Sequence, residues 1–233
     1  MEKLRILTYH RAGIPRTAGY EQFTVPPERF RGQVRWMRLL GFGFCSLDDV
    51  LPWLAGGRAG PKRPVVLTFD DGYAEVYQHA FPMLLERRIP AVVFLVPGRR
   101  TDDWVDWEGE DHLPLMEWGH AREMAEAGIT FGSHAMTHPR LPECDDARLR
   151  AEVADSKKMI EDQLGRAVRH FCYPYGKHDA RVVEAVREAG YETACTTHKG
   201  CVLRGTDPFL LPRLTVGKRM GTRRFLMRLL IRH

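Results

Sequence analysis

The chain has 233 residues, of which 44% are hydrophobic and 28% charged, a composition that fits a globular protein with a sizeable core. The net charge is only +5 and much of the basic excess falls after residue 217, so a nucleic-acid-binding body is not expected. Five cysteines without a Cys-x-x-Cys pair argue against a disulfide scaffold. Because neither a signal-like segment nor an apolar run long enough to cross a bilayer is visible, we expect a cytoplasmic protein.

Short apolar segments alternate with amphipathic segments along the chain. The segments that resemble buried parallel strands are 5–10, 65–70, 91–96, 129–134, 168–174, 191–197 and 211–216. Amphipathic helices are expected over 28–40, from a cap at Asp145 or Asp146 to Gly165, and from Asp179 to Gly190. This alternation predicts right-handed β-α-β units in one α/β domain over residues 1–233, built on a mainly parallel sheet or barrel.

Chemically active side chains follow several of these strands. The strand ends carry His10, Asp70 with Asp71, His134, and Pro174 with Tyr175. Because the carboxyl ends of parallel strands meet at one mouth of an α/β barrel, we expect these residues to converge there.

The histidines and the paired aspartates together suggest a metal site. His134 and His138 are four residues apart, so one helical turn or a tight loop can present both to one ion. Two imidazoles and one carboxylate form a common ligand set for a catalytic divalent metal, and this set leaves a position for water. Since Asp70 and Asp71 are adjacent, one can bind the metal while the other acts as a base toward that water. The combination predicts a metal-dependent hydrolase, although each motif alone also occurs in ordinary turns.

Three segments resemble a known family. They are TFDDG at 68–72, SHAMTH at 133–138 and YPYG at 173–176, and they are similar in order and spacing to the first three motifs of polysaccharide deacetylases. This is the NodB-homology group, carbohydrate esterase family 4, and the resemblance covers essentially the whole chain. It implies a distorted (β/α) barrel of about seven parallel strands. It also implies metal-dependent removal of N-acetyl groups from an amino-sugar-containing glycan, with Zn²⁺ as the expected ion.

The resemblance implies a role for each matching residue. The implied residues are Asp70 as general base, Asp71, His134 and His138 as metal ligands, and Tyr173, Pro174 and Tyr175 as the turn that contacts the substrate. Within this turn, the backbone N–H of Tyr175 would help to hold the oxyanion that forms during hydrolysis.

The chain departs from the family pattern in two places. Cys172 stands where the third motif often begins with an arginine that tunes the base. The Leu-x-x-His motif that supplies the general acid does not follow Gly176, but the sequence LTYH occurs at 7–10. This resembles the permuted poly-N-acetylglucosamine deacetylases, so His10 is the expected general acid and His198 the alternative. A strand-end histidine with a purely structural hydrogen bond remains a second interpretation of His10, and no acidic fourth motif is assigned.

Substrate and partners stay open at this level. The alternatives are a deformylase or deacylase of a lipid-linked sugar or small amide, and a catalytically weak carbohydrate-binding barrel. The polar segment 99–114, with Trp104 and Trp107, is a candidate substrate-facing loop. The basic amphipathic tail 218–233 is interpreted as a terminal barrel helix, with peripheral contact to a membrane surface as the alternative.

Overall fold

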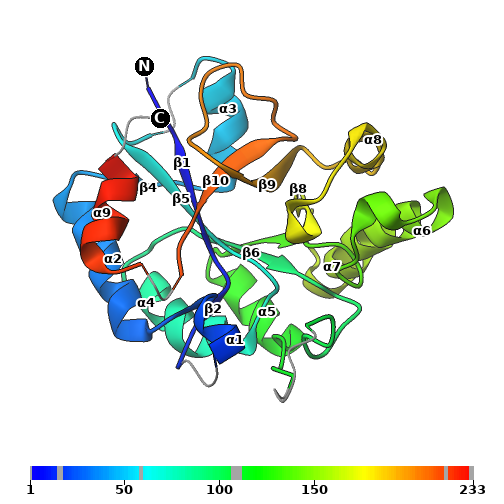
Figure 1. The fold of residues 1–233 in the computed structure, drawn as a ribbon, viewed down its shortest axis with the longest axis horizontal. Helices are drawn as coiled ribbons and strands as arrows, with labels where there is room; N and C mark the ends of the chain where they lie inside the picture. Colours follow the sequence, from blue (N-terminus) through cyan, green and yellow to red (C-terminus); the bar gives the residue numbers. More distant parts are fainter. Residues whose placement is uncertain (1, 15–17, 58–59, 106–111, 218–219, 231–233) are drawn as a thin grey trace.

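The computed structural model describes residues 2–14, 18–57, 60–105, 112–217 and 220–230. Within these ranges seven parallel strands close into a barrel, around which most of the helices are arranged (Figure 1). In order around the barrel, the strands are β1 (Arg5–Tyr9), β5 (Pro64–Phe69), β6 (Val92–Leu95), β7 (Thr130–Ser133), β8 (His170–Cys172), β9 (Thr193–Lys199) and β10 (Leu211–Thr215), which pairs back with β1. The expected barrel of about seven parallel strands is confirmed.

Each barrel strand overlaps one of the seven segments that the sequence indicates, with ends that differ by at most two residues. Three further strands have only two residues each, too few to show a period in the sequence. They are β4 (Gly43–Phe44), which pairs with β5, and the pair β2 (Arg11–Ala12) and β3 (Thr24–Val25) outside the barrel.

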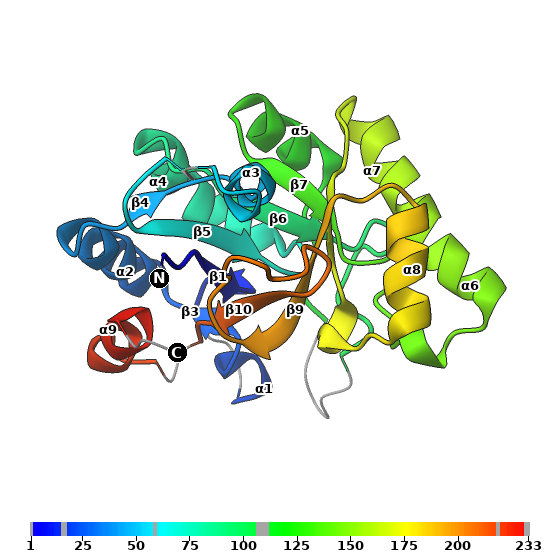
Figure 2. The ribbon, with the colours of Figure 1, turned by 90° about the horizontal axis from the view of Figure 1, so that it is seen from above.

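The helices follow the strands in the order that the alternation predicts (Figures 1 and 2). The α-helices are α1 (Ala18–Glu21), α2 (Pro27–Leu39), α3 (Val50–Leu54), α4 (Phe81–Glu86), α5 (Trp118–Glu126), α6 (Asp146–Arg150), α7 (Ser156–Leu164), α8 (Ala180–Glu188) and α9 (Thr222–Leu230). Short 3₁₀ turns are η1 (Leu47–Asp49), η3 (Leu141–Glu143) and η5 (Pro174–Gly176), and π-helical turns are η2 (Val76–Ala80) and η4 (Ala151–Asp155).

The expected helix from Asp145 to Gly165 forms as α6, η4 and α7 in direct succession. Its N-cap is Asp145, whose carboxylate accepts a hydrogen bond from the Arg148 N–H at 2.8 Å. The helix ends at Gly165, which has a left-handed φ of 64° that a residue with a side chain rarely adopts. Asp179 caps α8 in the same way, so both N-caps suggested by the sequence are confirmed.

Alternation along the strands divides the core in two. In β5, Val65, Leu67 and Phe69 pack outward against the helices, whereas Val66 belongs to the cluster inside the barrel. Because side chains alternate along a strand, Thr68 shares the inward direction of Val66, and Asp70 continues it at the strand end. The inner cluster contains Leu4, Ile6, Val66, Val92, Phe94, Cys172, Cys195 and Leu211 from the barrel strands and their ends, so each of these strands can extend an inward-facing residue toward the mouth.

The C-terminal helix α9 packs beside α2, as both ribbon views show (Figures 1 and 2). Phe225 and Leu229 are buried, and the Leu229 carbonyl accepts a hydrogen bond from Arg5 of β1. Met227 and Leu230 remain exposed, at 53% and 45%. Residues 218–219 and 231–233 of the expected amphipathic tail lie outside the described residues. Among the helices described, none combines the length and the apolar character that crossing a membrane requires.

Candidate active site

The strand ends surround a pocket of about 510 Å³, a size typical of small-molecule sites. His10 follows β1, Asp70 and Asp71 follow β5, and His134 follows β7, and all four residues line one cavity. The rest of the lining includes Phe23, Tyr73, Trp104, His138, Arg140, Tyr173, Tyr175, Thr197 and Thr215. The expected convergence at the mouth of the barrel is therefore found.

Asp71, His134 and His138 bring three ligand atoms together. Oδ1 of Asp71 lies 3.5 Å from Nε2 of His134 and 3.5 Å from Nε2 of His138, and the ligand atoms all lie within 4.8 Å of one another. Two ligands bound at about 2.0–2.2 Å to a tetrahedral ion stand roughly 3.3–3.6 Å apart, so these separations suit one Zn²⁺ ion. Among the residues that the structure describes, none forms a hydrogen bond with the buried Nδ1 of His138.

A neighbouring carbonyl fixes the tautomer of His134. Its Nδ1 lies 2.7 Å from the carbonyl oxygen of Cys172, so Nδ1–H donates and Nε2 keeps its lone pair toward Asp71. Burial lowers the pKa of His134 to about 4 and the pKa of His138 well below its usual value, so both rings are neutral at pH 7. Neutral imidazoles are the form that binds a metal.

The backbone at this site is unusual. Of the five described non-glycine residues with positive φ, four lie here: Asp71 at 70°, Ala135 at 64°, His138 at 61° and Tyr175 at 56°. Such residues persist only where the surrounding structure holds them, and they gather at functional sites. The His134–His138 pair is therefore presented by a tight loop and not by a helical turn.

Asp70 is paired with a residue that the sequence analysis missed. Its two carboxylate oxygens each accept a hydrogen bond from Arg213 of β10 at 2.7 Å, and both side chains are almost completely buried. Arg213 also donates to the Thr68 hydroxyl, the Thr196 carbonyl and the Cys172 sulfur, each at 3.0 Å. The arginine that pairs with Asp70 thus comes from another strand, β10, while position 172 is a cysteine. Arg213 stands on the inward-facing side of β10, two residues after Leu211 of the inner cluster, and this alternation was the signal that could have found it.

The two adjacent aspartates differ in their environments. Burial would raise the pKa of Asp70, but the charge and hydrogen bonds of Arg213 outweigh it and hold the pKa below its ordinary value. Burial and then the charge of Asp70 raise the pKa of Asp71 well above normal. A divalent cation at Asp71 would favour its ionised form.

His10 and His198, the two candidates for the general acid, lie in different places. His10 lines the pocket, its ring lies 5.0 Å from that of Phe23, and its buried Nδ1 has no hydrogen-bond partner within the described ranges. Burial lowers the pKa of His10, while the charge of Asp70 opposes this shift. His198 is exposed, packs against His178 and is not part of the described pocket lining. The structure therefore brings His10, and not His198, to the candidate metal ligands.

Aromatic side chains form much of the remaining wall. Tyr173 is buried, and its hydroxyl donates to the carbonyl of Phe209 at 3.1 Å. The Tyr175 ring is 42% exposed and meets the His138 ring edge-on, with 4.6 Å between the ring centres. Pro174 is also buried, and it begins the 3₁₀ turn η5, which follows Tyr173 and contains Tyr175.

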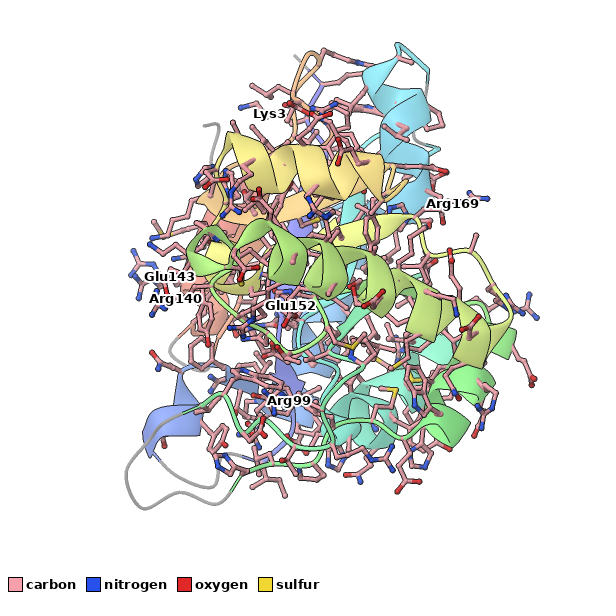
Figure 3. All side chains as sticks on the ribbon, turned by 90° about the vertical axis from the view of Figure 1, so that its right-hand side faces the viewer. Lys3, Arg99, Arg140, Glu143, Glu152 and Arg169 are labelled. Atoms are coloured by element: carbon pink, nitrogen blue, oxygen red, sulfur yellow. The ribbon has the colours of Figure 1, made fainter. Side chains whose placement is uncertain are left out.

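The candidate substrate-facing loop reaches the pocket through Trp104, which stacks on His138 at 4.6 Å. Trp107 lies outside the described residues. At the rim, the Arg140 guanidinium lies over the Tyr175 ring at 5.0 Å. Figure 3 shows Arg140 with Glu143 at one edge of the molecule.

Sequence comparison assigns the family. The family model for polysaccharide deacetylase matches residues 57–194, more than half of the chain, so the chain belongs to the polysaccharide deacetylase family. A Bacillus subtilis protein, YxkH, named as a polysaccharide deacetylase, is 27% identical over 219 residues, which cover 94% of this chain and 73% of YxkH. The poly-β-1,6-N-acetyl-D-glucosamine N-deacetylase of Staphylococcus aureus is 23% identical over 207 residues, which cover 84% of this chain and 69% of that protein.

Solved structures share the fold. The Streptococcus pyogenes deacetylase PplD in complex with acetate superposes with a TM-score of 0.85 over 97% of this chain and 98% of that one, at 24% identity. IcaB from Ammonifex degensii superposes with a TM-score of 0.80 over 98% of both chains, at 26% identity. The seven-stranded barrel is therefore the fold of these deacetylases.

Proposed function

We propose that this protein is a metal-dependent hydrolase that removes N-acetyl groups from an amino-sugar-containing glycan. The observation that carries the proposal is the separation of 3.5 Å from Asp71 Oδ1 to the Nε2 atoms of His134 and His138, in a pocket that Asp70 also lines. Family membership supports the reaction class, and the S. aureus relative named for poly-β-1,6-N-acetyl-D-glucosamine suggests the kind of glycan.

In this proposal Asp71, His134 and His138 hold the divalent metal, which we take to be Zn²⁺. Two imidazole nitrogens and one carboxylate oxygen are a typical set for catalytic zinc. Bound there, the ion would supply Lewis acidity, lowering the pKa of a coordinated water from about 15.7 toward about 7.

The remaining residues move protons and hold charge. Asp70, kept ionised by Arg213, accepts the proton of the attacking water. His10, in its protonated form, gives a proton to the departing sugar amine, and the backbone N–H of Tyr175 stabilises the oxyanion of the tetrahedral intermediate. The exposed aromatic face of Tyr175 and the stacked Trp104 give the sugar ring apolar surfaces to pack against.

Zinc binding and acetate release together test the proposal. We expect the purified protein to bind about one Zn²⁺ and to release acetate from N-acetylglucosamine oligomers. Asp70→Asn should keep the zinc and lose activity by about 10²–10⁴-fold, whereas His134→Ala should lose the zinc itself. An exposed aspartate on the helix α7, Asp162, offers a control: Asp162→Asn should change neither quantity. Full activity in Asp70→Asn would show that Asp70 is not the general base.

A second substrate class, a lipid-linked amino sugar, draws support from α9. This helix exposes Met227 and Leu230 beside Arg223 and Arg224, a combination suited to an anionic lipid surface. We propose a cytoplasmic protein that can make peripheral membrane contact here. Flotation with phosphatidylglycerol vesicles, with and without the residues after 220, tests this: equal flotation of both forms ends the membrane interpretation. The alternative of a catalytically weak carbohydrate-binding barrel is disfavoured by the intact cluster of Asp71, His134 and His138.

A further inference from the structure

The loop that joins His134 to His138 is held from outside the site. Gly98 donates its N–H to the Met136 carbonyl at 2.9 Å, and the Ser133 hydroxyl accepts from Ala135 N–H at 3.2 Å. These bonds secure the first half of the loop. The second half, which leads into His138, forms hydrogen bonds with one residue of the neighbouring helix.

That residue is Glu152, in the π-helical turn η4. Its carboxylate accepts a hydrogen bond from the Thr137 backbone N–H at 2.8 Å and another from the Thr137 hydroxyl at 2.5 Å. Its backbone carbonyl accepts a third bond, from Met136 N–H at 3.0 Å. Figure 3 looks onto the helix that contains η4 and labels Glu152 on it. The turn η4 interrupts the regular helical ladder, and such π-turns are often found at functional sites.

Glu152 is only 5% exposed, although glutamate is among the residues least often buried. A buried carboxylate is costly unless it is hydrogen-bonded or paired, and the bonds to Thr137 meet this need. Arg148 lies 3.8 Å away and is largely exposed, so it offers a weak counter-charge. The loop in turn holds Ala135 and His138 at φ values of 64° and 61°, which the surrounding contacts must maintain.

We propose that Glu152 is a positioning residue for the metal site. By fixing Thr137 and Met136, it holds the next residue, His138, with Nε2 toward Asp71 before any ion binds. This inference rests on the proposed function for its metal, but not on the identity of the glycan. Outer partners of metal ligands typically contribute about 10–100-fold to metal affinity.

The test is a zinc competition titration with a chromophoric chelator at 25 °C, without substrate. Glu152→Ala is expected to weaken zinc binding by about 10–100-fold while its circular dichroism shows a folded protein. Glu152→Gln should restore most of the affinity, because its amide can still accept from the Thr137 N–H and donate to the hydroxyl.

A matched control lies further along the same helix. Glu161 of α7 also accepts a backbone hydrogen bond, from Val168 N–H at 2.9 Å, and pairs with Lys157 at 3.1 Å. Glu161→Ala should lower the melting temperature and leave zinc affinity unchanged. If Glu152→Ala does not fold, Thr137→Val removes only the hydroxyl bond and is expected to weaken zinc binding by a few-fold.

The outcomes separate this inference from the proposed function. If the parent protein binds zinc and the folded Glu152→Ala or Thr137→Val protein binds it equally well, the positioning role is wrong and the deacetylase proposal stands. An equal loss of affinity in Glu161→Ala would likewise overturn it, because the effect would then be one of general stability. If the parent itself binds no zinc, the proposed function fails first.

Discussion

Replacing Arg213 with methionine tests the role of the buried ion pair with Asp70. Arg213 and Asp70 are joined by two hydrogen bonds of 2.7 Å, and their side chains are 1% and 3% exposed. Methionine keeps much of the volume of the arginine stem but leaves the carboxylate buried without its counter-charge. Arg213 therefore links the stability of the barrel to the protonation state of the candidate base.

The expected cost follows from these contacts. Two hydrogen bonds to a charged partner contribute about 1.5–3 kcal/mol each, which suggests about 3–6 kcal/mol for the pair. Breaking a buried ion pair by removing one partner typically costs about 3–5 kcal/mol, so the two estimates agree. Protonation of Asp70 in the variant would relieve part of the loss. Hence Arg213→Met should be less destabilised at pH 5 than at pH 8.

Urea unfolding and a pH–rate profile provide the measurements. Since Arg213 holds the pKa of Asp70 low, its removal should move the acidic limb of kcat/KM to higher pH. Arg11, fully buried and bonded twice to Glu75 at 2.9 Å, gives a matched control. Arg11→Met should lose similar stability but leave the acidic limb in place. A loss below about 1 kcal/mol in Arg213→Met, together with an unshifted limb, would refute the reasoning.

Three further predictions follow from the site and its supports. His10→Gln should lower kcat by about 10²–10⁴-fold at unchanged zinc affinity. An unaffected kcat would show that another group is the general acid. Gly176→Ala places a Cβ 1.9 Å from the Thr197 hydroxyl at a φ of 68°, so thermal unfolding should show at least about 1 kcal/mol of destabilisation. A hydrogen bond from His170 lowers the pKa of Asp48 to about 2. The ionised Asp48 carboxylate therefore stabilises the fold above about pH 4, and this stabilisation is lost toward pH 2. At pH 7, Asp48→Asn should therefore be less stable than the parent protein by under about 1 kcal/mol, since Asp48 is partly exposed. Near pH 2 the two proteins should be equally stable. A difference in stability that does not change with pH would contradict this prediction.

The sequence predicted the barrel because its strands are buried on both faces and read as apolar runs. It also located Asp70, Asp71 and His134, since each directly follows such a run and parallel strands end at one mouth. The two-residue strands β2, β3 and β4 were missed because so short a segment carries no period. The π-turn η4 was missed as well, because its residues continue the apolar pattern of an ordinary helix.

Arg213 shows what local patterns leave out. It is separated from Asp70 by 143 residues, so the two side chains meet only because the strands that carry them are paired around the closed barrel. The positive φ values of Ala135 and His138 were equally hidden, since neither alanine nor histidine signals a left-handed backbone as glycine does. Side-chain alternation in 211–216 does mark Arg213 as inward-facing, and a charge on an inner face requires a partner.

Acetate release from N-acetylglucosamine oligomers by the zinc-loaded protein, with Asp70→Asn measured beside it, tests the central claim most directly. We predict release by the parent and a loss of about 10²–10⁴-fold in the variant, with equal zinc content in both. Release at the same rate by both proteins would contradict the assigned base. No release by a zinc-loaded parent protein from any acetylated amino sugar, whether polymeric or lipid-linked, would contradict the deacetylase proposal itself.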